Sequence, residues 1–189
     1  MSAPFDARLA GHRALQGEKV RFRELRADDL PDLVQWWRNP EMALFQSLMV
    51  TPQPEDTVAD MFRSWSTNTG AGGVGFSVVD SATDELIGHV TLYGASLPAR
   101  AATLAVLIAP DHVDRGYGTD AVRLLTKFGF QEMGLHRIEL RVFAYNERAR
   151  AVYRKLGHVE EGTRRDIAFH GGEFHDEVIM AVLAEEWLQ

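Results

Sequence analysis

Apolar positions recur along the chain with two spacings, strict alternation and a period near 3.6, and so predict both strands and helices. Val, Ile and Leu are concentrated in residues 101–109 and 137–143, which is typical of buried strands. Alternation and β-branched or aromatic content predict the remaining strands, over residues 20–25, 74–79, 85–93, 162–169 and 174–183. The last two are expected to form a hairpin, because only His170-Gly171-Gly172-Glu173 separates them.

Helical spacing of apolar residues predicts four helices between these strands. They cover residues 30–38, 55–65, about 121–130 and 146–156. Asn39-Pro40 is expected to end the first helix, and Gly157 to cap the last. Residues 41–54 are expected to form a loop or a broken helix, and residues 1–18 a flexible N-terminal arm. This order of elements predicts a mixed sheet covered by helices, an α+β (mixed α/β) fold.

The composition is that of an ordinary globular domain. Of 189 residues, 46% are apolar and 25% charged, and residues 19–189 are expected to form one domain. The chain has no cysteine, which excludes disulfides and thiolate chemistry. Neither a membrane span nor a signal peptide is expected, and a cytoplasmic location is favoured. A net charge of −7 disfavours nucleic-acid binding. The arginines gathered between Arg137 and Arg165 instead suit a small anionic ligand.

The turn Arg115-Gly116-Tyr117-Gly118-Thr119 lies between a predicted strand and a predicted helix. In this arrangement backbone N–H groups and the helix dipole converge on an anion. Two glycines let the main chain approach phosphate oxygens without an intervening Cβ. The turn lacks the Lys-Ser/Thr pair of a P-loop and the third glycine of a Rossmann fingerprint. It therefore predicts a phosphate-bearing cofactor of another kind.

Further motifs accompany this turn, in the segments LAVLIAPDHVDRGYGTDAVRLLTKFGF, LHRIELRVFAYNERARAVYRKLG, EEGTRRD and GGEFHDEVIM. Together they resemble the GNAT superfamily of N-acetyltransferases, and more closely its RimJ/RimL-like branch. The similarity is strong from Leu104 to Met180 and loose before it. The resemblance implies the GNAT fold, with a central, mostly antiparallel twisted sheet of about seven strands flanked by about four helices. It also implies acetyl-CoA as the acetyl donor and no metal.

By position, the resemblance assigns ten residues to cofactor binding: Val106, Ile108, Arg115, Gly116, Tyr117, Gly118, Thr119, Asn146, Arg148 and Tyr153. A backbone N–H of the strand around Val106 to Ile108 is expected to meet the oxyanion. Tyr153 is implied as the general acid for the departing thiolate, and it follows Asn146 by two helical turns, on roughly the same face. A core tyrosine and a simple helix N-cap are the alternative interpretations of these two residues.

The sequence departs from the family pattern at Thr103, where many relatives have a glutamate that helps to deprotonate the amine. His89 is the remaining candidate catalytic base, because an unperturbed imidazole titrates near neutrality; a purely structural histidine is the alternative. Asp114 replaces a usual glycine, and His158 a usual phenylalanine. The family also implies that the first helices wall the acceptor site, which suggests acceptor contacts for three neighbours: Trp37, Arg38 and Asn39.

Two functions are consistent with these features. The first is an acetyl-CoA-dependent N-acetyltransferase, an acyltransferase that passes acetyl directly to a primary amine in a ternary complex, since no cysteine is present to carry the acetyl group. The acceptor is then a protein N-terminal α-amine or a small-molecule amine. Neither nucleic acid nor membrane is an expected partner, and a homodimer paired through strand edges is considered. The alternative is a non-catalytic sensor or assembly protein that binds coenzyme A or an acyl-CoA.

A metal site is a weaker alternative. His170, His175, Asp166 and Asp176 carry the right donor atoms, but they flank a Gly-Gly turn and are interpreted as polar hairpin positions.

Overall fold

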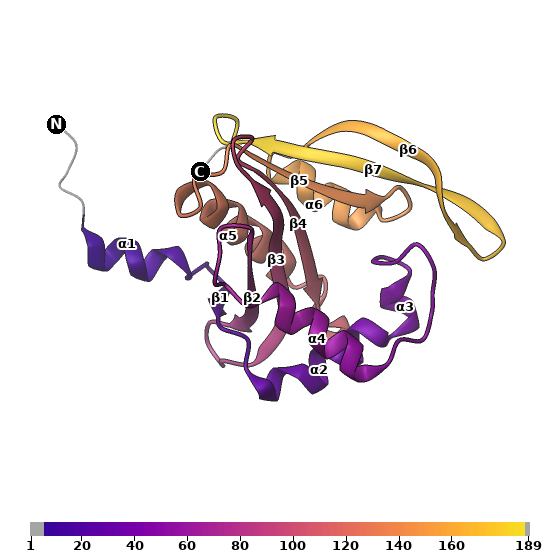
Figure 1. The fold of residues 1–189 in the computed structure, drawn as a ribbon, viewed down its shortest axis with the longest axis horizontal. Coiled ribbons are helices and arrows are strands. Elements are labelled where there is room, and N and C mark those ends of the chain that lie inside the picture. Colours follow the sequence, from indigo (N-terminus) through magenta and orange to yellow (C-terminus); the bar gives the residue numbers. More distant parts are fainter. Residues whose placement is uncertain (1–5, 188–189) are drawn as a thin grey trace.

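A computed structural model describes residues 6–187 of the chain (Figure 1). Its centre is one seven-stranded sheet with the strand order β1-β2-β3-β4-β5-β7-β6. The strands are β1 (Val20–Arg23), β2 (Gly73–Asp80), β3 (Leu86–Ser96), β4 (Ala101–Ile108), β5 (Arg137–Phe143), β6 (Val159–His170) and β7 (Glu173–Leu183). All neighbouring strands are antiparallel except β4 and β5, which are parallel.

Six helices lie in the described part of the chain. They are α1 (Ala7–Ala14), α2 (Leu30–Arg38), α3 (Pro40–Ala43), α4 (Glu55–Trp65), α5 (Tyr117–Gln131) and α6 (Glu147–Lys155), with 3-10 turns η1 (Ala27–Asp29) and η2 (Pro110–His112). The predicted α+β fold with a mostly antiparallel seven-stranded sheet is confirmed. The described residues contain six helices where about four were expected. The additional helices are α1, which forms within the predicted N-terminal arm, and α3, which forms at the start of the predicted loop. Residues 1–5 of the predicted arm lie outside the described residues.

Each face of the sheet carries its own hydrophobic core. The larger core lies under α5 and α6 and includes Phe22, Leu125 and Met180, which are buried. The smaller core lies under α2 and α4 and includes Leu33 and Phe62, also buried. The helices contribute amphipathic faces to these cores, as the spacing of their apolar residues predicts.

The sheet opens between its two parallel strands. β4 and β5 pair only from Ala101–Thr103 to Arg137–Glu139, and in Figure 1 the two strands diverge beyond this point. Each keeps its other neighbour: β4 stays paired with β3 as far as Ile108, and β5 with β7 as far as Phe143. Main-chain groups of β4 that face β5 beyond Thr103 are therefore left without a partner strand.

A buried ion pair ties α2 to the sheet. Two guanidinium nitrogens of Arg23 on β1 donate to the Asp29 carboxylate at 2.6 and 2.7 Å. Ser77 Oγ on β2 and the backbone N–H of Arg26 donate to it as well, at 2.7 and 2.9 Å. Burial acts to raise the pKa of Asp29, but these hydrogen bonds and the charge of Arg23 outweigh it and hold that pKa below its usual range. Because Asp29 directly precedes α2, the pair sets where α2 lies over the sheet.

Replacing Asp29 with Asn should lower the free energy of unfolding by about 3 kcal/mol, because the Arg23 guanidinium would stay buried without a counter-charge. Asp28→Asn, at the exposed neighbouring position, is the matched control and should change it by about 0.5 kcal/mol or less. Urea denaturation followed by circular dichroism measures both variants. Equal stability of the two variants would contradict the role given to Asp29.

Candidate active site

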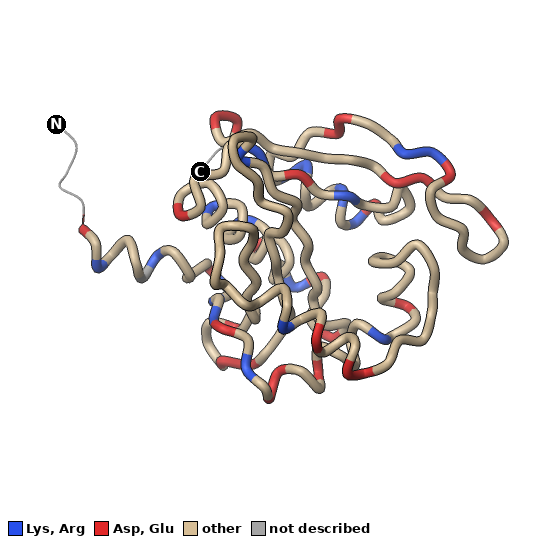
Figure 2. The backbone as a smooth tube through the Cα atoms, in the orientation of Figure 1, with Lys and Arg blue, Asp and Glu red and all other residues tan. Residues whose placement is uncertain are grey.

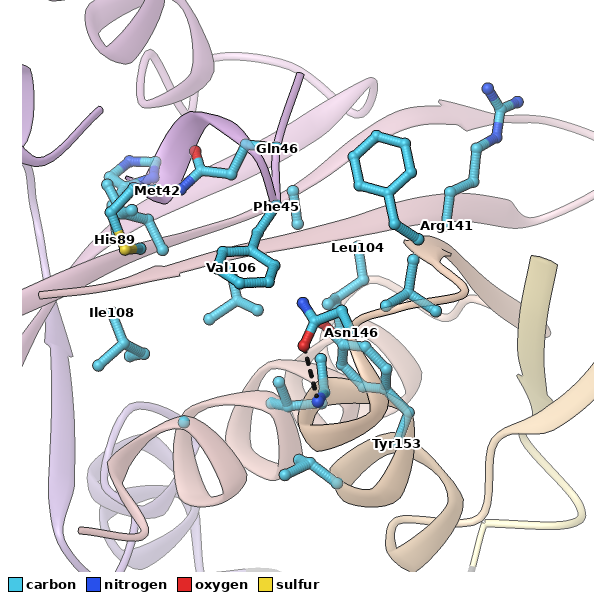
Figure 3. A pocket seen from close by; sticks show the side chains of 18 of the residues that line it. Met42, Phe45, Gln46, His89, Leu104, Val106, Ile108, Arg141, Asn146 and Tyr153 are labelled. Atoms are coloured by element: carbon cyan, nitrogen blue, oxygen red, sulfur yellow. Dashed lines mark hydrogen bonds between the residues drawn. The ribbon is translucent and has the colours of Figure 1, made fainter. Parts of the chain in front are cut away.

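A cavity of about 770 Å³ runs through the opening between β4 and β5. Leu104, Val106 and Ile108 of β4 line it and pack against the core under α5 and α6. Leu107 also lines it but belongs to the core under α2 and α4. Successive side chains of a strand point to opposite faces of a sheet, so a cavity that contacts all four residues passes through the sheet. In Figure 3, Asn146 and Tyr153 lie on one side of β4, and His89 and Gln46 on the other.

The half of the cavity on the α5 and α6 side, the α5–α6 half, is lined by the turn before α5 and by the first turns of α6. Its lining residues outside β4 include Val113, Asp114, Gly116, Gly118, Thr119, Val122, Asn146, Arg148, Ala149, Val152 and Tyr153. Gly116 is the N-cap of α5 and has φ 84°, a conformation that favours glycine. No side chain caps this end of α5, and the first helical hydrogen bond is donated by the N–H of Asp120 to the Gly116 carbonyl. The preceding N–H groups therefore point out of the helix and are available to an anion.

Charged side chains surround this turn. The Lys19 ammonium donates to the Arg115 carbonyl at 2.8 Å, and the backbone N–H of Lys19 donates to the Asp120 carboxylate, also at 2.8 Å. Arg148 pairs with Asp114 at 3.3 Å. Asp114 has φ 60°, a left-handed conformation that aspartate tolerates better than most residues, which explains how it replaces the usual glycine. Sequence reasoning missed Lys19, because no local pattern joins it to a turn 96 residues away.

Tyr153 is held at the centre of the α5–α6 half by the geometry of α6. Asn146 caps the helix by accepting from the N–H of Ala149 at 3.1 Å, and Gly157, with φ 88°, ends it. The N–H of His158 then donates to the Tyr153 carbonyl at 3.0 Å, which completes the C-terminal cap. The Tyr153 side chain is buried, and burial raises its pKa to about 12. Its hydroxyl therefore keeps its proton throughout the physiological pH range.

His89 does not have the near-neutral pKa that the sequence analysis expected. It lies on β3, 2% exposed, between Phe62 and Trp65, and burial lowers its pKa to about 4. Asp29 acts in the opposite direction but is outweighed. The Nε2 atom is 2.8 Å from Ser66 Oγ, so one ring nitrogen is already hydrogen-bonded. His89 lines the cavity as a neutral imidazole.

The other half of the cavity, the α2–α4 half, is walled by aromatic and apolar side chains. They come from α2, α3, the segment that follows α3, α4 and the opposite face of β3 and β4, and include Trp37, Met42, Phe45, Gln46, Leu48, Phe62, Trp65, Thr91, Tyr93, Thr103 and Ala105. Thr103, where a glutamate was expected from the family, brings no carboxylate to this half.

Four of the predicted site residues do not line the cavity with their side chains. The Tyr117 hydroxyl donates to Asp80, away from the turn, and the Arg115 side chain is also outside the lining. Arg38 pairs with Glu55 at 2.5 Å. Asn39 caps α3 by accepting from the N–H of Glu41 at 2.9 Å. Tyr117, Arg38 and Asn39 thus have partners outside the cavity, whereas the predicted residues other than these and Arg115 meet at the cavity.

Residues 19–159 match the family model described as an acetyltransferase (GNAT) domain. The chain belongs to the GNAT acetyltransferase family. "Putative ribosomal N-acetyltransferase YdaF" of Bacillus subtilis is 33% identical to this chain over 102 residues. The matched region covers 54% of this chain and only 56% of that protein. The uncharacterized N-acetyltransferase YnaD of the same organism is 31% identical over 136 residues, 72% of this chain and 79% of that protein.

Solved structures agree with this family. A crystal structure of spermidine N-acetyltransferase from Vibrio cholerae in complex with CoA and spermine matches with a TM-score of 0.80 and 26% identity, over 90% of this chain and 99% of that one. The family and these relatives confirm the predicted GNAT membership and the enzyme class, N-acetyltransferase.

No helix among residues 6–187 has the length and apolar character to cross a membrane. Within the same range, no group of three or more histidine, cysteine, aspartate or glutamate side chains is arranged to hold a metal ion. The two histidines of the candidate metal site have other neighbours: His170 Nε2 lies 3.1 Å from the Ser47 carbonyl oxygen, and His175 Nε2 lies 3.2 Å from that of His170.

His158, which replaces a usual phenylalanine, is a buried polar group beside Tyr153. The two rings are tilted, with centroids 5.8 Å apart. His158 is 2% exposed, and neither ring nitrogen has a hydrogen-bond partner in the described structure. Burial lowers its pKa to about 4, although the nearby backbone of Tyr153 acts in the opposite direction. Between about pH 4 and 6.5, His158 therefore binds a proton in the unfolded chain but not in the folded protein. Folding stability falls as the pH is lowered through this range, because the proton stabilises the unfolded chain.

Replacing His158 with Phe should remove this pH dependence. Relative to the wild type, the variant should gain about 2 kcal/mol of folding stability on going from about pH 8 to about pH 5, because phenylalanine has no proton to bind. Urea denaturation at the two pH values measures the gain. His136→Phe, at an exposed position, is the control and should show no such gain. A gain of equal size in both variants would show that burial of His158 is not its cause.

Proposed function

We propose that this protein is an acetyl-CoA-dependent N-acetyltransferase that passes acetyl directly to a primary amine while both substrates are bound. The observation that supports it is the passage of one cavity through the sheet. Its α5–α6 half ends at an uncapped helix N-terminus suited to phosphates, and its α2–α4 half offers a separate space for an acceptor. A protein that only senses coenzyme A needs no second half, so the sensor alternative is not favoured.

The α5–α6 half fits coenzyme A. The N–H groups of residues 117–119 and the glycine N-cap suit the pyrophosphate, and the Lys19 ammonium lies beside the same turn. Asn146, Arg148 and the apolar side chains of β4 and α6 would flank the rest of the molecule. Bound there, acetyl-CoA supplies the activated acetyl thioester. This assigns phosphate binding to the backbone of the turn rather than to the side chains of Arg115 and Tyr117.

Backbone N–H groups of β4 provide an oxyanion site that sequence alone could only suggest. The N–H of Ala109 donates to the Ile87 carbonyl on β3, whereas the Arg100 carbonyl accepts from His136, on the β5 side. Polar groups alternate along a strand, so those of Val106 and Ile108 face β5, where the ladder has already ended. These N–H groups are free to donate to an acyl oxygen in the cavity.

Tyr153 is the proposed proton donor. Tyr153 lines the same half of the cavity, and a phenol with a pKa of about 12 remains protonated and able to donate to a sulfur anion. A free thiol has a pKa of about 8.5, so complete transfer would be uphill in water. Burial in the same apolar cavity raises the pKa of a thiol as well, which narrows this difference.

The chain needs no strong general base for this reaction. With a pKa of about 4, His89 cannot retain a proton taken from an ammonium group, so its proposed role is reduced to that of a neutral hydrogen-bonding partner. The apolar walls of the α2–α4 half act in its place, because desolvation lowers the pKa of an ammonium group and favours the free amine. An acceptor site with apolar walls therefore does not require a glutamate at position 103, where this chain has Thr103.

The relatives indicate more than one kind of acceptor. One is named for ribosomal acetylation, and another is solved with spermine. A protein N-terminal α-amine, as in the RimJ/RimL-like branch, and a small-molecule amine are therefore both proposed as acceptors.

The formation of a homodimer also stays a prediction.

Replacing Tyr153 with Phe should lower kcat by about 100-fold, because the variant loses the donated proton and little else. Thiol release from acetyl-CoA with an accepted amine measures kcat. The Kd for coenzyme A, measured by calorimetry, should stay within about twofold, because the phenyl ring still fills the same space. An unchanged kcat would remove Tyr153 from the proposed mechanism, and a large loss of affinity would show that its role is in binding.

A further inference from the structure

The α2–α4 half of the cavity is walled by aromatic rings that hold one another in place. Trp37, Phe62 and Trp65 contact pairwise, edge to face, with ring centroids 5.6 to 5.9 Å apart. The Trp37 indole N–H already donates to Gln53 at 3.0 Å and is not directed at a ligand. This wall therefore presents an apolar surface of fixed shape, which suits an apolar or aromatic ligand.

The segment that covers this half carries no charge. No acidic or basic residue occurs in residues 42–54, and Figure 2 shows the stretch between α3 and α4 without charged positions. Phe45 and Leu48 line the cavity and are 42% and 49% exposed. The segment is held over the opening because Tyr145 donates to the Leu44 carbonyl, and His170 Nε2 lies 3.1 Å from the Ser47 carbonyl.

The charged groups that line this half are mostly basic. Glu177 is the one carboxylate among its described lining residues, and Arg164 binds it at 2.7 Å. Arg141 also lines the cavity and forms no ion pair within the described part of the chain. A second ammonium group on an acceptor would therefore find two guanidinium groups and no free carboxylate. Aromatic faces attract ammonium groups too, but weakly compared with the cost of burying an unpaired charge.

We infer that the acceptor is a primary amine on an aromatic or bulky aliphatic body, with no second ammonium group, and that polyamines are poor substrates. This rests on the proposed function. In the reaction the amine nitrogen forms a bond to the acetyl carbon and loses a proton, while the thioester C–S bond breaks and the sulfur takes up a proton. The apolar body of the acceptor fills the α2–α4 half, and its amine reaches the opening between β4 and β5.

Thiol release from acetyl-CoA, measured with a panel of amines, tests this inference. The panel contains 2-phenylethylamine, tryptamine, putrescine and spermidine. The two aromatic amines should give values of kcat/KM at least about tenfold above those of the two polyamines. Calorimetric binding of the same amines to the protein saturated with coenzyme A should give the same order of affinity, independently of turnover.

Replacing Leu48 with Glu should shift the preference toward polyamines. The substitution places a carboxylate at a half-exposed position on the cavity wall, so it does not disturb the core. The ratio of kcat/KM for 2-phenylethylamine to that for spermidine should fall by about tenfold. Met49→Glu is the matched control, because Met49 is 68% exposed and does not line the cavity; its ratio should stay that of the wild type.

The outcomes separate this inference from the proposed function. A higher kcat/KM for spermidine than for both aromatic amines in the wild type would overturn the inference and leave the acetyltransferase function standing. Equal shifts in Leu48→Glu and Met49→Glu would overturn the assignment of the acceptor to this half of the cavity. No turnover with any of the four amines would overturn the inference, and only a lack of turnover that also extends to peptides with free N-termini would overturn the proposed function.

Discussion

The separation of β4 from β5 beyond Thr103 is the constraint on which the site depends. These are the two parallel strands of the sheet, and the chain passes from one to the other through α5. Ligands of such β-α-β units bind at the carboxyl ends of the strands, where the helix begins. Here the divergence opens the sheet at that end, so the uncapped N-terminus of α5 lies at the mouth of a cavity instead of against a closed sheet.

The opening also connects two chemically different spaces. On one face it meets backbone N–H groups at the N-terminus of α5, and on the other it meets aromatic rings packed between α2, α4 and the sheet. Arg23 and Asp29 hold α2 over this second face. A cofactor with phosphate groups and an apolar amine would therefore approach from opposite sides and meet at β4. In the proposed reaction, acetyl would pass between the two substrates without a carrier residue.

Local patterns predicted most of the fold. The helix over Glu55–Trp65 and the strand over Arg137–Phe143 have the expected bounds, because their periodicity is strong and breakers flank them. The turn at Gly116 and the cap at Asn146 were visible for the same reason. Long-range packing decided the rest. The pKa of His89 depends on the rings of α4 that bury it, and Lys19 reaches the turn only through the tertiary fold.

A crystal structure of the protein with coenzyme A and an accepted amine would show whether the two substrates meet from opposite faces of the sheet. We expect the phosphates at the N–H groups of residues 117–119, the sulfur in the opening between β4 and β5, and the amine on the opposite face of the sheet beside Trp65. Both ligands bound on the same face of the sheet, or coenzyme A bound away from the start of α5, would contradict this expectation.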